Sequence, residues 1–96
     1  MTREIALVGS LCTGHEDWPP RRAITGSSTV FINGLGVHCV GDLWEVHCHK
    51  NNKDCHDSFL SEGSGTIFVE GKSVGRVGDL IACGSFVATG SPNVGG

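Results

Sequence analysis

The chain has 96 residues, of which 15 are glycine, none is tyrosine and 18% are charged. Its seven Lys and Arg residues and its formal net charge of −3 argue against a nucleic-acid binder, which normally presents a basic face. No apolar run reaches the roughly 18 residues that a membrane span requires, and the apolar stretch at Ile5–Val8 is too short for a secretory signal. We therefore expect synthesis in the cytoplasm, and one domain over residues 1–96.

Two segments of the chain repeat one another. Residues 26–43 have the sequence GSSTVFINGLGVHCVGDL and residues 63–80 have GSGTIFVEGKSVGRVGDL, with ten of eighteen positions identical. A truncated third copy, GSPNVGG, occupies residues 90–96. Repetition of this kind indicates a fold assembled from equivalent units. Helix formers are scarce, so we predict an all-β fold with repeat units at about 26–43, 63–80 and 90–96.

The first unit has the pattern of a β-hairpin. Residues 29–32 are β-branched or aromatic, which is typical of a strand. Asn33-Gly34 predicts a type I′ turn, which requires positive φ at both central residues. A second strand is expected over Val37–Val40, and Gly41-Asp42 ends it with another turn.

The second unit repeats this pattern, with a first strand over residues 66–69 and a second over Val74–Val77. Glu70-Gly71 supplies the hairpin turn, although Glu is less suited than Asn to its first position. The third copy supplies about one strand. Phenylalanines at matching places are expected in the core: Phe31, Phe59, Phe68 and Phe86.

Potential metal ligands occupy the segments that lead into the repeats. His56 and Cys83 each lie seven residues before the glycine that opens the next unit. His15 lies eleven residues before the corresponding glycine, a difference that we attribute to an insertion around residues 17–20. If the repeats surround a pseudo-threefold axis, these positions meet on that axis.

A fourth ligand is available in the same region. His47 lies five residues after Asp42, while Cys83 lies four residues after Asp79, so His47 approaches the same place from the other side. A structural zinc ion prefers four nitrogen or sulfur ligands in a tetrahedron. We therefore predict a zinc site formed by His15, His47, His56 and Cys83.

Other ligand sets remain open. The segment from His47 to His56 holds five candidates, so His49 or Cys55 replaces one member in the alternative assignment. His38 is expected on the surface or in the core rather than at a metal. The alternative to ligation for the remaining cysteines is a role as small buried side chains: Cys12, Cys39 and Cys48.

These motifs resemble the PAAR-repeat family over about residues 7–96. The resemblance rests on GSSTVFING and GSGTIFVEG, on the VGD endings and on the closing GSPNVGG. The Pro-Ala-Ala-Arg run that gives the family its name is missing after both turns, and only Arg76 keeps its arginine. This departure falls on predicted strand residues and leaves the predicted ligands untouched.

The resemblance implies a structural rather than a catalytic role. PAAR proteins are small cones with pseudo-threefold symmetry and a zinc ion near the vertex, bound by three histidines and one cysteine. One chain caps and sharpens the blunt end of a trimeric β-helical spike that pierces a target membrane. The spike belongs to a contractile phage tail baseplate or to a type VI secretion system, so we expect the chain at such a tip, delivered outward on contraction.

Two other functions are alternatives to the spike tip. A zinc hydrolase needs an open metal position, but the sequence has no HExxH motif, and turn capping accounts for the repeated Asp42 and Asp79. A zinc-stapled protein-interaction adaptor is the second alternative.

Overall fold

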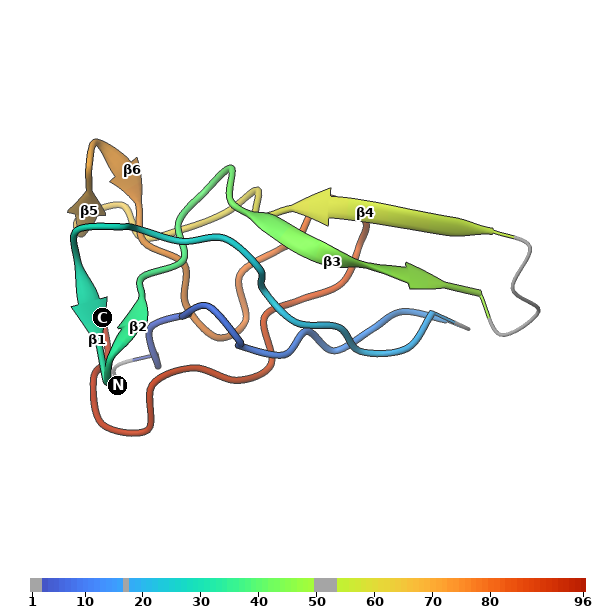
Figure 1. Ribbon diagram of the computed structural model, residues 1–96, viewed down its shortest axis with the longest axis horizontal. Coiled ribbons are helices and arrows are strands. Elements are labelled where there is room, and N and C mark those ends of the chain that lie inside the picture. Colours follow the sequence, from blue (N-terminus) through green and yellow to red (C-terminus); the bar gives the residue numbers. More distant parts are fainter. Residues whose placement is uncertain (1–2, 17, 50–53) are drawn as a thin grey trace.

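Short antiparallel hairpins form the framework of the fold (Figure 1). The computed structural model describes residues 3–16, 18–49 and 54–96, and within these ranges the strands form three two-stranded sheets. The described residues contain no helix that could cross a membrane. The predicted all-β class is confirmed. The strands are β1 (Phe31–Ile32), β2 (Leu35–Gly36), β3 (Leu43–Cys48), β4 (Cys55–Phe59), β5 (Phe68–Val69) and β6 (Lys72–Ser73).

Both predicted hairpin turns are confirmed. β1 pairs with β2, and β5 pairs with β6, each across a two-residue turn. The φ angles are 55° at Asn33 and 76° at Gly34, and 54° at Glu70 and 79° at Gly71. All four are positive, as type I′ geometry requires. Glu70 thus adopts the left-handed conformation although Asn suits it better.

The predicted bounds of the second strand are wrong in both units. Val37–Val40 and Val74–Val77 were expected to continue the hairpins, but β2 and β6 end before these segments. The first segment instead forms a bridge to Leu7, and the second forms one to Cys39. Apolar residues that seemed to extend a hairpin therefore join neighbouring repeats to one another.

Three chain segments meet in a closed ring of backbone hydrogen bonds. The Ala6 N–H donates to the Gly75 carbonyl (2.8 Å), the Gly75 N–H to the His38 carbonyl (2.9 Å), and the His38 N–H to the Ala6 carbonyl (3.0 Å). Each residue donates once and accepts once, as three positions related by a threefold axis must. All three are buried. The ring is thus the centre of the pseudo-symmetry.

The third repeat is completed by the N-terminal end of the described chain. Residues 6–11, ALVGSL, take the place of HCVGDL at 38–43 and GRVGDL at 75–80. A bridge joins Glu4 to Gly95, where β1 and β2 pair in the first repeat. The predicted third unit at 90–96 was therefore only half of a unit, since its other half lies at the opposite end of the sequence.

One turn recurs in all three repeats. Its glycine has a φ between 91° and 95°, and the next side chain accepts the N–H of the residue three positions before it. This bond satisfies a backbone donor inside the turn. The accepting residues are Ser10, Asp42 and Asp79, so the predicted capping role of the two aspartates is confirmed.

The prediction that four phenylalanines lie in the core is wrong. They are 45–57% exposed: Phe31, Phe59, Phe68 and Phe86. The residue after each of two of them is buried instead, with Leu60 at 0% and Val87 at 1% exposure. Consecutive side chains of an extended chain point to opposite sides. The repeat pattern therefore identified segments that do lie against the core, but the prediction chose the residues on their outward face.

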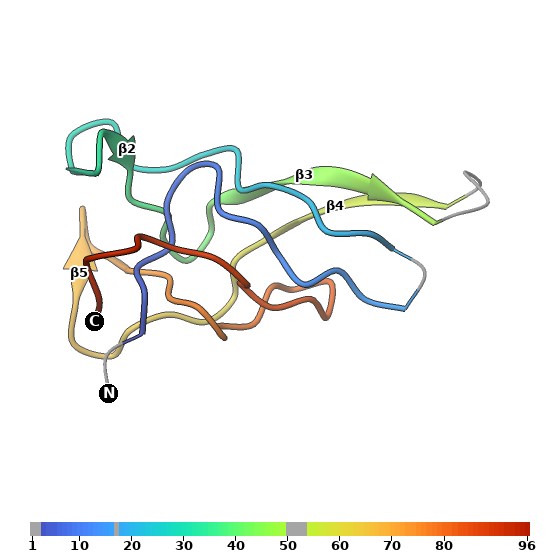
Figure 2. The same cartoon turned by 90° about the horizontal axis from the view of Figure 1, so that it is seen from below.

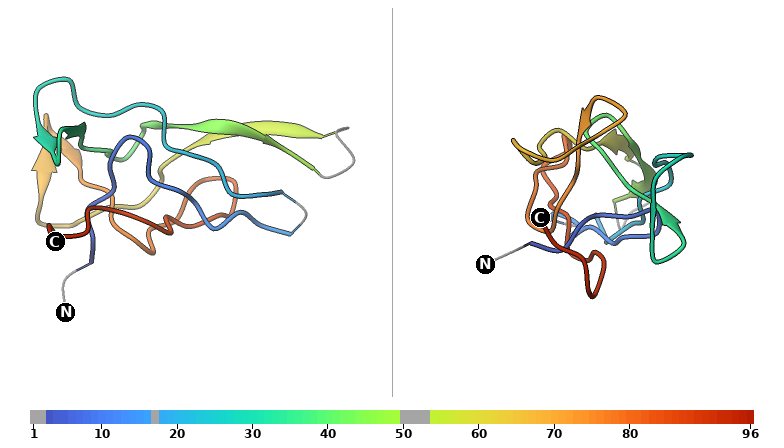
Figure 3. Two further views of the ribbon diagram at one scale, coloured as in Figure 1. Left: turned by 60° about the horizontal axis from the view of Figure 1, so that its bottom comes forward. Right: turned by 90° about the vertical axis from the view of Figure 1, so that its left-hand side faces the viewer.

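The molecule is elongated, with principal extents of 38 × 27 × 22 Å. The two short hairpins and the chain ends gather at its wide end, the base, while β3 and β4 extend to the opposite end, the vertex (Figures 1 and 2). Viewed along the long axis, the repeats surround a common centre (Figure 3). The shape agrees with the expected pseudo-threefold cone.

Candidate metal centre

Three segments of the chain, which we call the arms, run from the ring towards the vertex and return. The first spans residues 11–23, the second spans 43–60 and contains β3 and β4, and the third spans 80–87. Each arm is closed at its foot by the same bond, in which the returning chain donates an N–H to the carbonyl of the turn residue at 2.8–3.0 Å. The feet are alike, whereas the far ends of the arms differ in length and sequence.

Each arm brings at least one predicted ligand to the same place. On the second arm, His47 and His56 are cross-strand partners of β3 and β4. On the first, His15 exchanges two backbone hydrogen bonds with Trp18, at 2.9 and 2.8 Å, which fixes the turn that carries it. On the third, Cys83 sits in a tight turn closed by a bond from the Gly84 N–H to Ile81.

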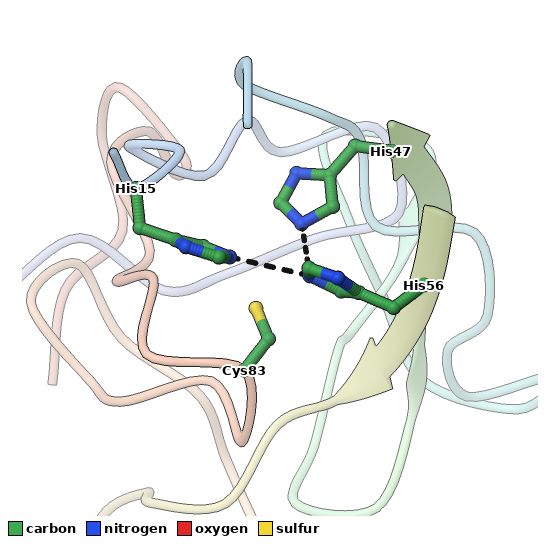
Figure 4. A group of neighbouring side chains, drawn as sticks. All are labelled: His15, His47, His56 and Cys83. Atoms are coloured by element: carbon green, nitrogen blue, oxygen red, sulfur yellow. Dashed lines mark hydrogen bonds between the residues drawn. The ribbon is translucent and has the colours of Figure 1, made fainter. Parts of the chain in front are cut away.

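The four predicted ligands converge (Figure 4). One ligand atom from each of His15, His47, His56 and Cys83 lies within 4.8 Å of all the others. The His56 Nε2 is 3.2 Å from the His15 Nε2 and 2.5 Å from the His47 Nε2. His47 is buried and the other three are partly buried. The sequence thus identified residues that the fold assembles, while metal binding itself stays a prediction.

The orientation of His47 directs a lone pair into this cluster. Its Nδ1 lies 2.8 Å from the Pro19 carbonyl oxygen, to which a ring nitrogen can only donate. In the neutral ring the Nε2 is then unprotonated, and it faces the Nε2 of His56. A carbonyl partner of this kind is the usual support of a metal-binding histidine, because it fixes the tautomer and the ring plane.

The cluster favours the neutral form of His56. The pKa of His56 is lowered, first by burial and then by the neighbouring His47 and His15, whose positive charges would repel its own. The Nε2 atoms of three histidines face one another, and a proton between two of them leaves the lone pair of the third without a partner. A cation at their centre would accept all three lone pairs at once.

The donor set fits zinc. Zinc–nitrogen bonds of about 2.0–2.1 Å and a zinc–sulfur bond of about 2.3 Å in a tetrahedron place ligand atoms about 3.3–3.7 Å apart. The two Nε2 separations given above, 3.2 and 2.5 Å, are shorter than this, and all four ligand atoms lie within 4.8 Å of one another, so small side-chain movements would bring them to these distances. Three imidazoles and a thiol are borderline to soft ligands that suit zinc better than calcium or magnesium. With four protein ligands, the centre has the composition of a structural site.

Aromatic and core residues border the cluster on two sides. Trp18 stacks on His15, with ring centroids 5.1 Å apart, and lies 5.4 Å from the ring of His56. Towards the base, a small cavity is shared by His47, His56 and Cys83 with three pseudo-equivalent residues. These three belong to the core: Cys12, Trp44 and Ile81. The centre therefore sits on the core.

The predicted equivalence of His15 with His56 and Cys83 is wrong. His15 follows Ser10 by five residues, as His47 follows Asp42, and these turns are equivalent in structure. His15 and His47 are thus on outgoing halves of arms, and His56 and Cys83 on returning halves. The insertion around residues 17–20 is not needed, since arm length varies; Asp17 lies outside the described residues.

The alternative ligands lie outside the cluster in this structure. Cys55 is bonded to Cys48 in a disulfide, which removes the thiol that the alternative assignment of Cys55 as a ligand requires. Cys48, for which a role as a small buried side chain was the alternative to ligation, is half-buried in this bond. His49 stands against Trp18, with ring centroids 4.8 Å apart, and is not part of the convergent cluster. Cys12 and Cys39 are buried, in line with the alternative to ligation, and His38, expected on the surface or in the core, lies in the core.

A comparison with protein families matches most of the chain. The family model described as PAAR motif covers residues 13–89, a stretch that includes all four residues of the cluster. No curated protein matches the chain.

Proposed function

The chain belongs to the PAAR-motif family, and from this premise we propose that it caps the blunt end of a trimeric β-helical spike in a contractile injection apparatus. In this proposal one zinc ion, held by His15, His47, His56 and Cys83, stabilises the vertex. The spike belongs to a phage tail baseplate or to a type VI secretion system. The chain acts as a structural part and not as an enzyme.

The pseudo-threefold base is the observation that carries the proposal. A single chain that caps a trimer must offer three similar contact surfaces, and the repeats do so. Three pseudo-equivalent side chains have nearly equal exposure at 39%, 38% and 39%: Val30, Ile67 and Val94. Val30 and Ile67 directly precede β1 and β5. Apolar side chains beside short hairpin edges suit the end of a three-stranded structure, where uncovered strand edges otherwise invite aggregation.

The metal accounts for the stability of the narrow end. A domain of this size buries too little surface for a large core, and small domains often depend on a metal. The zinc, when bound, adds bonds that exist only in the folded chain and joins all three arms. In zinc-finger peptides such binding contributes about 10–16 kcal/mol in apparent terms. The arms can thus resist separation when the vertex meets a membrane.

The direct test is assembly with a purified trimeric β-helical spike. We expect one chain and one zinc per spike trimer, measured by native mass spectrometry with elemental analysis. Ile67→Asp places a charge at one of the three pseudo-equivalent apolar positions and should abolish the complex. Val46→Asp is the matched control, because Val46 is 50% exposed on β3, away from the base, and should leave assembly intact. Three chains per trimer would contradict the proposal.

A further inference from the structure

A disulfide crosses the second arm directly beside the candidate metal centre. Cys48 on β3 and Cys55 on β4 are cross-strand partners, with their Cα atoms 4.0 Å apart. The next pair inward is His47 with His56, half of the predicted ligand set. The bond therefore fixes the strand pair that positions two of the four ligands.

The ladder on the other side of the histidine pair is irregular. Leu43 and Trp44 pair with β4 in one register, and the register shifts between Trp44 and His47. Regular pairing thus does not hold the histidines from the base side. Beyond the disulfide, a bond of 2.7 Å from the His49 N–H to the Asp54 carbonyl continues the ladder. The outer end of the arm is thus a short ladder that includes the covalent bond, and the register shift separates it from the pairing nearer the base.

We propose that the Cys48–Cys55 disulfide is a redox clip that governs how tightly the vertex retains its metal. The inference rests on the proposed zinc centre. With the clip closed, His47 and His56 are held at a fixed separation before the metal binds. With the clip open, the outer hairpin can separate beyond the register shift, which costs preorganisation and speeds metal release. Outer supports of metal ligands typically change affinity by about 10–100-fold.

The clip closes by thiol–disulfide exchange with a small-molecule disulfide. The exposed Cys55 thiolate attacks one sulfur of that disulfide, and the first small thiolate leaves as the mixed disulfide forms. The Cys48 thiolate then attacks the Cys55 sulfur, and the second small thiolate leaves. The two protons lost by the cysteines are taken up by the leaving thiolates, so the protein is oxidised by two electrons and the small disulfide is reduced.

The other cysteines do not compete for this reaction. Cys12 and Cys39 are buried, and burial raises the pKa of the Cys39 thiol to about 11, so little thiolate is present near neutral pH. Cys83 belongs to the ligand cluster. Exchange is therefore directed to Cys48 and Cys55, at the outer end of the arm.

The test compares the zinc-loaded chain before and after reduction by a phosphine, with zinc transfer to an excess of chelator as the readout. Mass spectrometry after thiol labelling counts the free cysteines in each state. We expect transfer to be about 10–100-fold slower with the clip closed. The Cys48→Ser/Cys55→Ser double variant should transfer zinc at the faster rate, with or without reductant.

The outcomes separate the clip from the metal centre. Equal rates in the oxidised and reduced chains would overturn the clip and leave the zinc proposal intact. Slower release from the reduced chain would also overturn it, because the freed thiols would then act as ligands. A chain that binds no zinc in either state would overturn both. A double variant that still responds to reductant would place the redox effect elsewhere.

Discussion

The base and the vertex of this protein are built by opposite means. At the base, three equivalent segments are joined by a ring of backbone hydrogen bonds, and each has the same turn. At the vertex, arms of three different lengths carry different residues, joined through side chains. The base repeats one backbone arrangement three times, whereas the vertex joins arms that differ in length and sequence.

The chemistry of each end explains this difference. Every residue has the same backbone N–H and C=O groups, so residues of different types can form a symmetric ring as long as their side chains leave room for it. A tetrahedral metal needs four ligands, which strict threefold symmetry cannot supply, since it yields ligands in multiples of three. The cluster instead combines two outgoing positions, His15 and His47, with two returning positions, His56 and Cys83. Symmetry at the base and its loss at the vertex are therefore both required.

The largest expected effect comes from removing a ligand at the vertex. His56→Ala should lower zinc affinity by more than about 100-fold, beyond what loss of an outer support costs, and should lower the melting temperature of the zinc-loaded chain. Chelator competition and calorimetry measure the two effects. His49→Ala is the matched control, since His49 is also on the second arm but outside the cluster. Equal losses in both variants would contradict the ligand assignment.

The next effect tests the core beneath the ring. Leu60→Ala should destabilise the chain by about 2–5 kcal/mol, because Leu60 is fully buried and its truncation leaves a cavity. Phe59→Ala, at the adjacent position with 49% exposure, should cost less than about 1 kcal/mol. Denaturant unfolding measures the free energy of unfolding of both variants. A larger loss of stability in Phe59→Ala than in Leu60→Ala would contradict the assignment of Leu60, rather than Phe59, to the core.

A smaller effect tests how closely the symmetric ring is packed. A Cβ at Gly75 would overlap the Leu60 side chain and lie 3.1 Å from the His38 carbonyl oxygen. Gly75→Ala should therefore destabilise by about 1–3 kcal/mol through overpacking. Gly65 has open space around its Cβ position, so Gly65→Ala should instead stabilise by about 0.4–1 kcal/mol. Denaturant unfolding measures both changes in stability. If both variants were stabilised, or both destabilised, the result would contradict this packing.

The smallest effect is a pH dependence from His38, whose backbone belongs to the ring. Burial is the main cause of the lowered pKa of His38; the hydrogen bond to the Thr25 carbonyl and the charge of Asp42 oppose it, and Lys72 adds to it. The unfolded chain then binds more protons than the folded one, so the contribution is present above about pH 6.5 and is lost as pH falls below it. The melting temperature of the metal-free chain should fall on acidification.

His38→Gln isolates this contribution, because glutamine is polar but does not titrate. The variant should lose less melting temperature than the parent chain between pH 7 and pH 5. His56, whose pKa is also lowered, contributes equally to both proteins. Parallel pH profiles for variant and parent would show that His38 has no part in the effect.

The sequence revealed the base more completely than the arms, for physical reasons. Asn33-Gly34 and Glu70-Gly71 form the expected turns because positive φ is a local preference. The bounds of the second strands were missed because Val37 and Val74 pair with other repeats, which is a long-range choice. The N-terminal half of the third repeat, ALVGSL, matches the VGD endings and was visible in the sequence, but it lies far from its C-terminal half.

The site was predicted as a set of residues but not as a geometry. Repeat register identified His56 and Cys83 as members of the cluster, whereas His15, which also joins it, was included on the basis of a wrong equivalence, since arm length is free to vary at the vertex. The disulfide was missed because spacing alone does not tell a cross-strand cysteine pair from two ligands. Its position one step from His47 and His56 depends on the pairing of β3 with β4.

X-ray absorption at the zinc edge of the purified chain tests the central claim most directly. A single zinc per chain should show a first shell of three nitrogens at about 2.0–2.1 Å and one sulfur at about 2.3 Å. The sulfur contribution should disappear in Cys83→Ser. A first shell with two sulfurs, a shell made mainly of oxygen, or a chain that contains no zinc would contradict a vertex closed by three histidines and one cysteine.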